Sequence, residues 1–164
     1  EEMDPFMGGG EMISTVSKDG FTPNEIPWRF EAGTPAIAEV ITLKVAIDYI
    51  KSIGIENIAE YEIDLLEYAT TNILEIDGIE TYACGDIDKG PVVSFNVKGV
   101  HPYDLTQILD QMGVAIRSGH HCAQPLMNVF GVEAMNRVSL SFYNTKNEID
   151  YLIKSIQKSI LIIS

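Results

Sequence analysis

Apolar residues recur at intervals of three and four along three long segments, which predicts three helices that each pack by one face. The first begins near residue 35 and ends at Gly54, the second follows it directly, and the third closes the chain. Their apolar stripes are Val40, Leu43, Ile47 and Ile50; Ile58, Tyr61, Leu65 and Tyr68; and Ile149, Leu152, Ile153, Ile156 and Ile160. Thr145 and Glu148 form a capping box, which predicts where the third helix starts.

Alternating apolar and polar residues predict strands between these helices. The runs "IETYAC" (79–84) and "PVVSFNV" (91–97) flank a turn-forming segment and are expected to pair as a hairpin. Another helix, "HPYDLTQILDQMG" (101–113), ends at its glycine. Further strands are predicted at 114–117 and 137–143, with a short helix near 125–131 and one more strand around 12–16. In the strand at 137–143, Val138 and Leu140 share a face, so Arg137 points away from the apolar side.

These elements predict an α+β fold, in which helices pack on a small, mostly antiparallel sheet. A chain of 164 residues with 46% hydrophobic residues can bury one core of ordinary size. Residues 1–33 are rich in Gly and Pro and show no sustained period, so they are expected to form a lead-in segment. Residues 34–164 are expected to form the domain.

The charge and the cysteine content narrow the choice of partners and compartment. A formal net charge of -13 opposes binding to nucleic acid. The chain starts without a basic region followed by an apolar one, and the apolar run "SILIIS" is far too short to cross a bilayer, so no membrane partner is expected. Two cysteines outside any CxxC pair fit a reducing compartment, and we expect the cytoplasm.

Cys122 is the strongest candidate for chemistry. In "RSGHHCAQP" (117–125) it follows His120 and His121 and lies close to Arg117, and such neighbours favour the thiolate that a nucleophile needs. A structural cysteine and a zinc ligand are the alternatives. Zinc sites usually space their ligands as CxxC or HxxxH, and three consecutive residues do not easily converge on one ion, so no metal is expected. A cysteine protease would need a distant partner histidine, and only His101 remains.

Arginine is scarce: the chain has eight lysines but three arginines, and Arg117 and Arg137 bracket the cysteine loop. A guanidinium group suits the bidentate binding of a carboxylate or phosphate, although an ordinary salt bridge is the alternative. In "FEAGTPA", Thr34 is expected to be a helix N-cap, and such a helix start attracts a phosphate, although capping alone would explain the residue. The glycines of "MGGG" (7–10) allow close backbone approach or a tight turn. Cys84 has no cationic neighbour and is expected to be structural.

Three motifs occur in one order: "PWRFEAGTP" (27–35), "RSGHHCAQPLM" (117–127) and "SLSFYNT" (139–145). Together they resemble the C-terminal part of the pyridoxal-phosphate-dependent cysteine desulfurases of the SUF iron-sulfur assembly type, within the class V aminotransferase family. The resemblance covers almost the whole chain. Its compact cysteine loop is similar to the SUF branch rather than to the branch with a long loop. The implied fold is the C-terminal small domain of a fold type I aminotransferase.

The resemblance also implies roles for single residues. Cys122 matches the cysteine that removes sulfur from L-cysteine, which gives alanine and a persulfide. Arg137 matches the arginine that holds the substrate carboxylate, with Arg117 and His121 at active-site positions beside it. Thr34 matches the threonine that reaches the cofactor phosphate of the neighbouring subunit in a homodimer. The implied partner is a sulfur-acceptor protein of the SUF system.

One departure from the family pattern is large. The family's Schiff-base lysine follows a histidine, and none of the eight lysines here does. Residues 1–33 are therefore expected to lead in from a cofactor domain, and the fragment alone is expected to lack pyridoxal 5'-phosphate and activity. The alternatives are a stand-alone persulfide carrier, a selenocysteine lyase or sulfinate-processing relative, and a structural domain with a vestigial loop.

Overall fold

The computed structural model describes residues 3–82 and 89–163 and confirms the α+β prediction. Contacts divide the chain into two units, Glu1–Ser52 and Ile53–Ser164. Unit 1 contains β1 (Ile13–Val16), β2 (Phe21–Pro23), the 3-10 helix η1 (Trp28–Phe30) and nearly all of α1 (Ile37–Ile53). Unit 2 contains α2 (Ile55–Leu74), β3 (Ile79–Tyr82), β4 (Val92–Val97), α3 (Pro102–Gln111), β5 (Arg117–Gly119), α4 (Gln124–Phe130), β6 (Met135–Ser139) and α5 (Lys146–Ile163).

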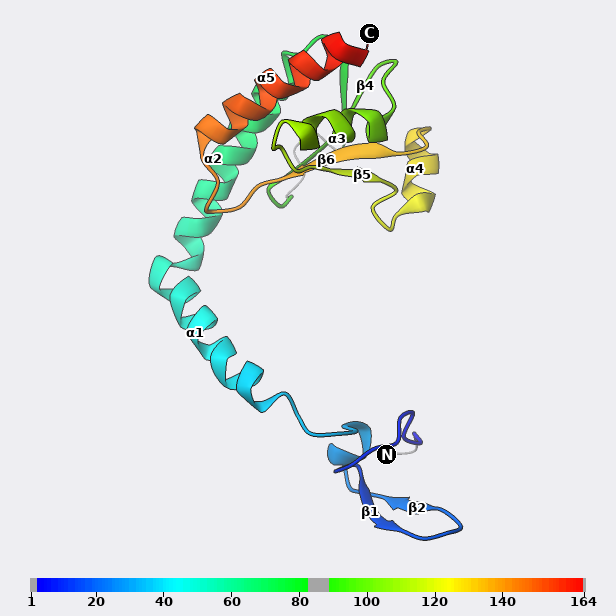
Figure 1. The fold of residues 1–164 in the computed structure, drawn as a ribbon. Coiled ribbons are helices and arrows are strands. Elements are labelled where there is room, and N and C mark those ends of the chain that lie inside the picture. Colours follow the sequence, from blue (N-terminus) through cyan, green and yellow to red (C-terminus); the bar gives the residue numbers. More distant parts are fainter. Residues whose placement is uncertain (1–2, 83–88, 164) are drawn as a thin grey trace. The chain divides into compact units, whose positions relative to one another are not determined.

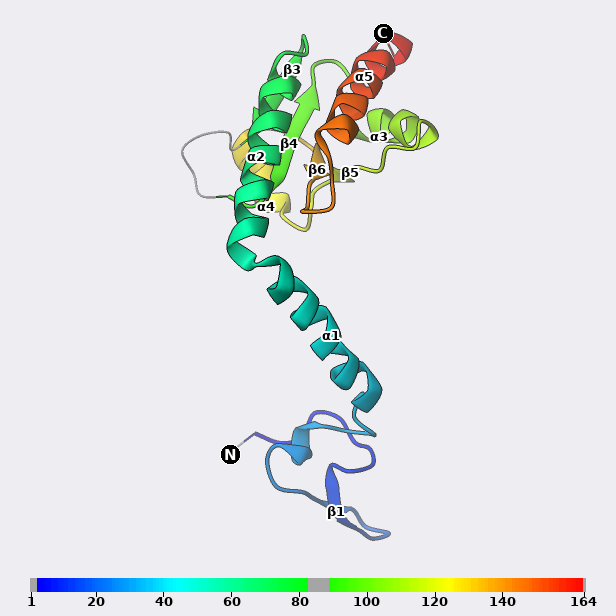
Figure 2. The same ribbon diagram turned by 90° about the vertical axis from the view of Figure 1, so that its left-hand side faces the viewer.

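A four-stranded sheet organises unit 2. Its strand order is β3-β4-β6-β5, and every neighbouring pair is antiparallel. The predicted β3–β4 hairpin is confirmed. Helices α2, α3 and α5 cover one face of the sheet, whereas α4 lies at the end where β5 stops and β6 begins (Figures 1 and 2). Among the described residues of unit 2, the long helices therefore all lie on one side of the sheet.

The core lies between the sheet and these three helices. It contains Val93, Phe95, Val97 and Val138 from the sheet, Leu65, Leu66, Ala69 and Ile73 from α2, Leu105 and Leu109 from α3, and Ile149, Leu152 and Ile156 from α5. Burial of each large side chain contributes about 1.5–3 kcal/mol. The predicted stripe of the last helix is confirmed, but Ile58 and Tyr61 at the start of α2 lie outside this core.

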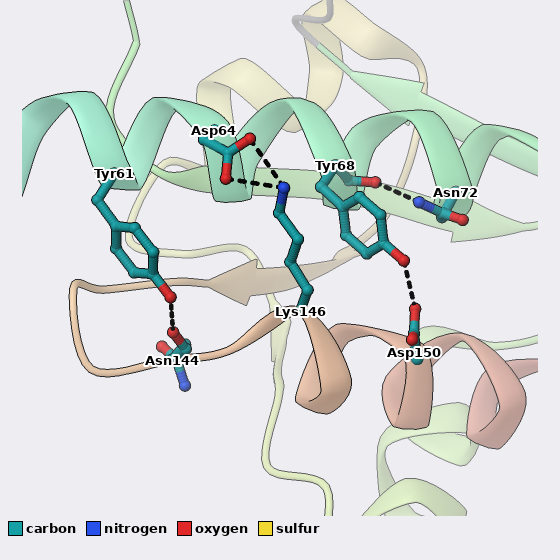
Figure 3. A network of polar contacts seen from close by, with 7 residues as sticks. All are labelled: Tyr61, Asp64, Tyr68, Asn72, Asn144, Lys146 and Asp150. Carbon is teal, nitrogen blue, oxygen red and sulfur yellow. Dashed lines mark hydrogen bonds and ion pairs between the residues drawn. The ribbon is translucent and has the colours of Figure 1, made fainter.

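Polar contacts join α2 to the segment that leads into α5 (Figure 3). Tyr61 donates to the Asn144 carbonyl at 2.8 Å, and Lys146 pairs with Asp64 at 2.9 Å. The Tyr68 hydroxyl donates to Asp150 at 2.7 Å, and this bond is the main cause that raises the pKa of Tyr68 above 10.0. Because these contacts join segments about eighty residues apart, they fix the start of α5 beside α2.

The capping box at the start of α5 is confirmed. The Thr145 N–H donates to Glu148 Oε2 at 2.7 Å, and the Glu148 N–H donates back to Thr145 Oγ1 at 3.3 Å. Just before it, Glu62 Oε1 accepts from Ser141 Oγ at 3.1 Å and from the Phe142 N–H at 3.0 Å. One carboxylate of α2 therefore holds the turn that precedes α5.

Two predicted strands have different bounds in the structure. The strand predicted at 114–117 begins only at Arg117, because the Val114 N–H still donates to the Leu109 carbonyl at the end of α3. The strand predicted at 137–143 spans Met135–Ser139. It ends early because residues 141–144 form a turn, closed by the Asn144 N–H on the Ser141 carbonyl.

Unit 1 contains a small hairpin that confirms the strand predicted around 12–16, although its partner β2 was not predicted. The glycines of "MGGG" allow a close backbone approach or a tight turn, and the structure shows a close approach: the Gly33 N–H donates to the Gly10 carbonyl at 2.9 Å. A Cβ on Gly9 would lie 3.1 Å from the Ala32 Cβ. The absence of a side chain at Gly9 therefore lets these two segments meet.

Helix α1 confirms the helix but not its predicted cap. Its first i to i+4 hydrogen bond runs from the Val40 N–H to the Ala36 carbonyl, which puts Ala36 rather than Thr34 at the N-cap position. The reason is a tight turn, in which the Ile37 N–H donates to the Pro35 carbonyl. The structure describes every residue of α1, and none of them is buried. Among the described helices, none has the length and apolar character needed to cross a membrane.

Candidate active site

A row of side chains crosses the sheet on the face opposite the core. Arg117 on β5 lies directly opposite Arg137 on β6, which in turn lies opposite Ser94 on β4, and Ser94 lies opposite Tyr82 on β3. Directly opposed residues project from the same face of a sheet. The prediction that Arg137 points away from the apolar side agrees with this register, because its neighbour Val138 belongs to the core.

The two arginines form an unfavourable pair by themselves. Like charges directly opposite each other destabilise a sheet, and an anion between them removes the penalty. Arg137 Nε is buried and has no hydrogen-bond partner among the described residues. This geometry suits the binding of a carboxylate or a similar anion.

Cys122 lies in a tight turn between β5 and α4. The Ala123 N–H donates to the His120 carbonyl at 2.8 Å, and both central residues have positive φ, 53° for His121 and 59° for Cys122. This combination of φ signs is that of a type I′ turn, which glycine and asparagine normally supply. Two consecutive side-chain-bearing residues in this region store conformational strain.

The sulfur of Cys122 is free and exposed, and it lies beside a guanidinium group. Arg117 Nη2 donates to Cys122 Sγ at 3.8 Å, within the range for a hydrogen bond to sulfur. Because Arg117 stands opposite Arg137, the sulfur lies next to the arginine pair. The geometry therefore suits an anionic group at the arginines with the Cys122 sulfur beside it.

His121 is tied to the sheet rather than to the sulfur. Its Nε2 lies 2.9 Å from the Met135 carbonyl oxygen. Burial is the main cause that lowers the pKa of His121 below its ordinary value of 6.5, and the hydrogen bond to Met135 opposes this shift. The neighbouring charges of Arg137, Arg117 and His120 lower the pKa further. His121 is therefore neutral at neutral pH.

Sequence reasoning missed Asn96, which supports the start of β6. Its Nδ2 donates to the Ala134 carbonyl at 2.8 Å, and its Oδ1 accepts from the Asn136 N–H at 3.3 Å. Its Nδ2 also lies 3.3 Å from the Tyr82 hydroxyl. The Tyr82 ring packs against Phe130 of α4, with 5.3 Å between the ring centroids. An asparagine inside an otherwise apolar strand is disfavoured, and that was the available signal.

The structure brings four of the five predicted site residues into one part of unit 2: Arg117, His121, Cys122 and Arg137. Thr34 is exposed in unit 1, just before α1. The structural role predicted for Cys84 falls outside the described residues. Within the part of the chain that is described, no three side chains of His, Cys, Asp or Glu cluster as a metal site would require.

Comparison with known proteins assigns this arrangement to a class. The family described as aminotransferase class-V matches residues 1–152, and the chain belongs to that family. A probable cysteine desulfurase of Synechocystis sp. is 48% identical over 162 residues, which are 98% of this chain and 39% of the relative. A cysteine desulfurase of Escherichia coli is 45% identical over 159 residues, which are 96% of this chain and 39% of the relative.

Solved structures agree with these relatives. The cysteine desulfurase CsdA (S-sulfonic acid) from Escherichia coli is 34% identical and superposes with a TM-score of 0.85, covering 98% of this chain and 39% of that protein. The apo cysteine desulfurase of Thermococcus onnurineus NA1 is 38% identical, with a TM-score of 0.83 over 94% of this chain and 38% of that protein. The chain thus spans about two fifths of the relatives it matches.

Proposed function

We propose that this chain is the C-terminal part of a SUF-type cysteine desulfurase. In the proposal, Cys122 takes the sulfur of L-cysteine, which leaves alanine and a Cys122 persulfide for iron-sulfur cluster assembly. The observation that supports this proposal most directly is the exposed Cys122 sulfur beside Arg117, in a site where Arg117 and Arg137 face each other. The names of the relatives support the same reaction class.

The sulfur transfer follows from this arrangement. The Cys122 thiolate attacks the sulfur of the substrate, and a sulfur–sulfur bond forms while the substrate's carbon–sulfur bond breaks. The electron pair of the broken bond stays on the substrate side, where the carbon takes up a proton to give alanine. Arg137 holds the substrate carboxylate with Arg117 beside it, which fixes the substrate sulfur near Cys122.

Pyridoxal 5'-phosphate, when bound to the complete protein, supplies the electron sink that weakens the carbon–sulfur bond. The described residues fit only part of that group. Thr34 is exposed and follows Gly33, and a Cβ placed on Gly33 or on Gly10 would meet no atom within 4 Å. Thr34 would contact the phosphate of the neighbouring subunit's cofactor. The chain lacks the histidine–lysine pair expected of the Schiff-base site.

The organisation of the complete protein is part of the proposal. Residues 1–33 lead in from the cofactor domain and residues 34–164 form the C-terminal small domain. The complete protein is a cytoplasmic homodimer that passes sulfur to an acceptor protein of the SUF system. The 164-residue chain alone binds no cofactor and releases no alanine from cysteine.

The test uses the complete reading frame that contains this chain. Purified protein is incubated with L-cysteine, and alanine release is measured for wild type, Cys122→Ser and Arg137→Lys. We expect release by wild type, none by Cys122→Ser, and a raised KM for Arg137→Lys because lysine cannot form the bidentate contact. If the wild type released alanine from selenocysteine but not from L-cysteine, the selenocysteine lyase alternative would be supported instead.

The 164-residue chain is the matched comparison. Cofactor absorbance or alanine release by this chain would contradict its proposed inactivity. Persulfide uptake by the chain from a donor protein, with no alanine release by the complete protein, would support the persulfide carrier instead.

A further inference from the structure

The turn that presents Cys122 needs an external anchor. His121 and Cys122 both have φ in the left-handed region, and neither is a glycine or an asparagine. The turn's own hydrogen bond, from the Ala123 N–H to the His120 carbonyl, is common to turns in general and compensates no side-chain strain. Strain of this kind persists only where the surrounding structure imposes it.

The contact of His121 with Met135 fixes one tautomer. A backbone carbonyl can only accept, so the hydrogen on this 2.9 Å contact belongs to His121 Nε2. In the neutral ring, Nδ1 then carries a lone pair, and this atom is buried without a partner among the described residues. A second proton on Nδ1 would create a buried N–H without a partner and a positive charge near Arg117 and Arg137, and both are unfavourable. The ring is thus suited to anchor the turn and not to carry protons.

Asn96 fixes the carbonyl that His121 uses. The Asn96 side chain bonds the Ala134 carbonyl and the Asn136 N–H, so its two contacts bracket Met135. Met135 itself pairs with Gly119 of β5, immediately before the turn. The peptide carbonyl of Met135 is therefore held from β4 on one side and from β5 on the other.

We propose that His121 and Asn96 are positioning residues for Cys122: Asn96 holds the Met135 carbonyl in place, and His121, as its Nε2–H tautomer, ties the left-handed turn to that carbonyl. The consequence is that Cys122 Sγ stays beside Arg117 while the thiolate reacts. Neither residue exchanges a proton with the sulfur. The inference deepens the proposed function and rests on it for the role of Cys122.

Two substitutions of His121 separate the anchor from backbone strain. Asparagine tolerates positive φ well, but its amide is too short to reach the place of Nε2. Glutamine tolerates positive φ less well, but its amide can donate to the Met135 carbonyl. The proposal predicts that His121→Gln preserves the turn better than His121→Asn, whereas a turn limited by strain alone predicts the reverse order.

The readout is the reaction of Cys122 with two disulfide probes, one anionic and one neutral, in the 164-residue chain with Cys84→Ser. The rate with the anionic probe divided by the rate with the neutral probe reports how close the sulfur lies to the arginines. The accessibility of the sulfur affects both rates alike and therefore cancels in this ratio. We expect the ratio to fall about fivefold in His121→Asn and in Asn96→Ala, the size expected from one lost hydrogen bond. It should stay near wild type in His121→Gln and in the matched control Asn72→Ala, because the Asn72 side chain donates to the Tyr68 carbonyl within α2.

Nitrogen NMR of the histidine rings gives a second measurement, and its result for the wild-type protein does not depend on the folding of any variant. Wild-type His121 should show the Nε2–H tautomer, and Asn96→Asp should turn it into a mixture. An Nδ1–H tautomer, or a rate ratio lower in Gln than in Asn, would overturn the inference even if alanine release succeeds. Failure of alanine release with the tautomer intact would overturn the proposed function and leave the anchor standing.

Discussion

Helices α1 and α2 follow each other across Gly54 and have similar apolar content, yet they bury different amounts of it. Helix α2 places Leu65, Leu66, Ala69 and Ile73 in the core of unit 2. Helix α1 buries nothing, and its large apolar side chains are exposed, with Leu43 at 56% and Val45 at 70%. A helix that is apolar on most of its surface is typical of a protein interior. Helix α2 thus has a partner surface within unit 2, whereas α1 has the apolar composition of an interior helix without buried residues.

The largest expected effect separates two leucines on these helices. Leu65→Ala removes a side chain that is 0% exposed, and we expect it to lower the free energy of unfolding by about 2–5 kcal/mol. Leu43→Ala on α1 should change it by less than about 0.5 kcal/mol. Urea unfolding of the 164-residue chain followed by circular dichroism measures both. Equal losses would mean that α1 is buried in solution.

A smaller effect is expected where α2 is joined to the turn before α5. Glu62→Ala leaves the Ser141 hydroxyl and the Phe142 N–H without their acceptor, which should cost about 1–3 kcal/mol. Glu39→Ala on α1 is the matched control, and we expect no measurable loss. Thermal unfolding compares the two variants. A Glu62→Ala protein as stable as wild type would show that the polar contacts of α2 are dispensable.

The capping box gives the next effect in size. Thr145→Ala removes the hydroxyl that accepts from the Glu148 N–H and donates to Glu148 Oε2, and we expect a loss of about 1 kcal/mol in unfolding free energy. Thr145→Ser keeps the hydroxyl and should lose much less. Hydrogen exchange at the first turn of α5 should rise in the alanine variant, and unchanged exchange there would argue against the cap.

The smallest effect is a dependence on pH. Because the pKa of His121 is lowered in the folded chain, the unfolded chain binds its proton first as pH falls below 6.5. Stability from this group is therefore complete above that pH and is lost below it, as pH falls through the lowered pKa. The unfolding free energy of wild type minus that of His121→Gln is measured from about pH 7.5 to about pH 5.5. We expect this value to fall towards low pH, because only the wild type loses stability through the imidazole. A rise of this value towards low pH would contradict a neutral His121.

The periodicity of the sequence predicted the helices and the hairpin because short-range patterns determine them. It did not predict the Ala36 cap or the early end of β6, which depend on turns at residues 35–37 and 141–144. Nor did it show that no residue of the α1 stripe is buried, because a stripe predicts a helix and not its partner.

For the site, residue type predicted more than spacing did. The scarcity of arginine singled out Arg117 and Arg137, and the register of β5 and β6 sets them opposite each other. The unusual place of Asn96 in an apolar strand was visible in the sequence, but its role was not, because its contacts with Ala134 and Asn136 arise only when β4 and β6 pair. A left-handed turn at two residues other than glycine also leaves no local signal.

The central claim is that Cys122 receives the sulfur, and the most direct test is to locate that sulfur. The complete protein is mixed with L-cysteine, its thiols are blocked and the protein is digested. Mass spectrometry then measures the masses of the peptides that contain Cys122 and Cys84. The account predicts one added sulfur atom on the Cys122 peptide and none on the Cys84 peptide. Alanine release with the added sulfur on Cys84, or with none on Cys122, would contradict it.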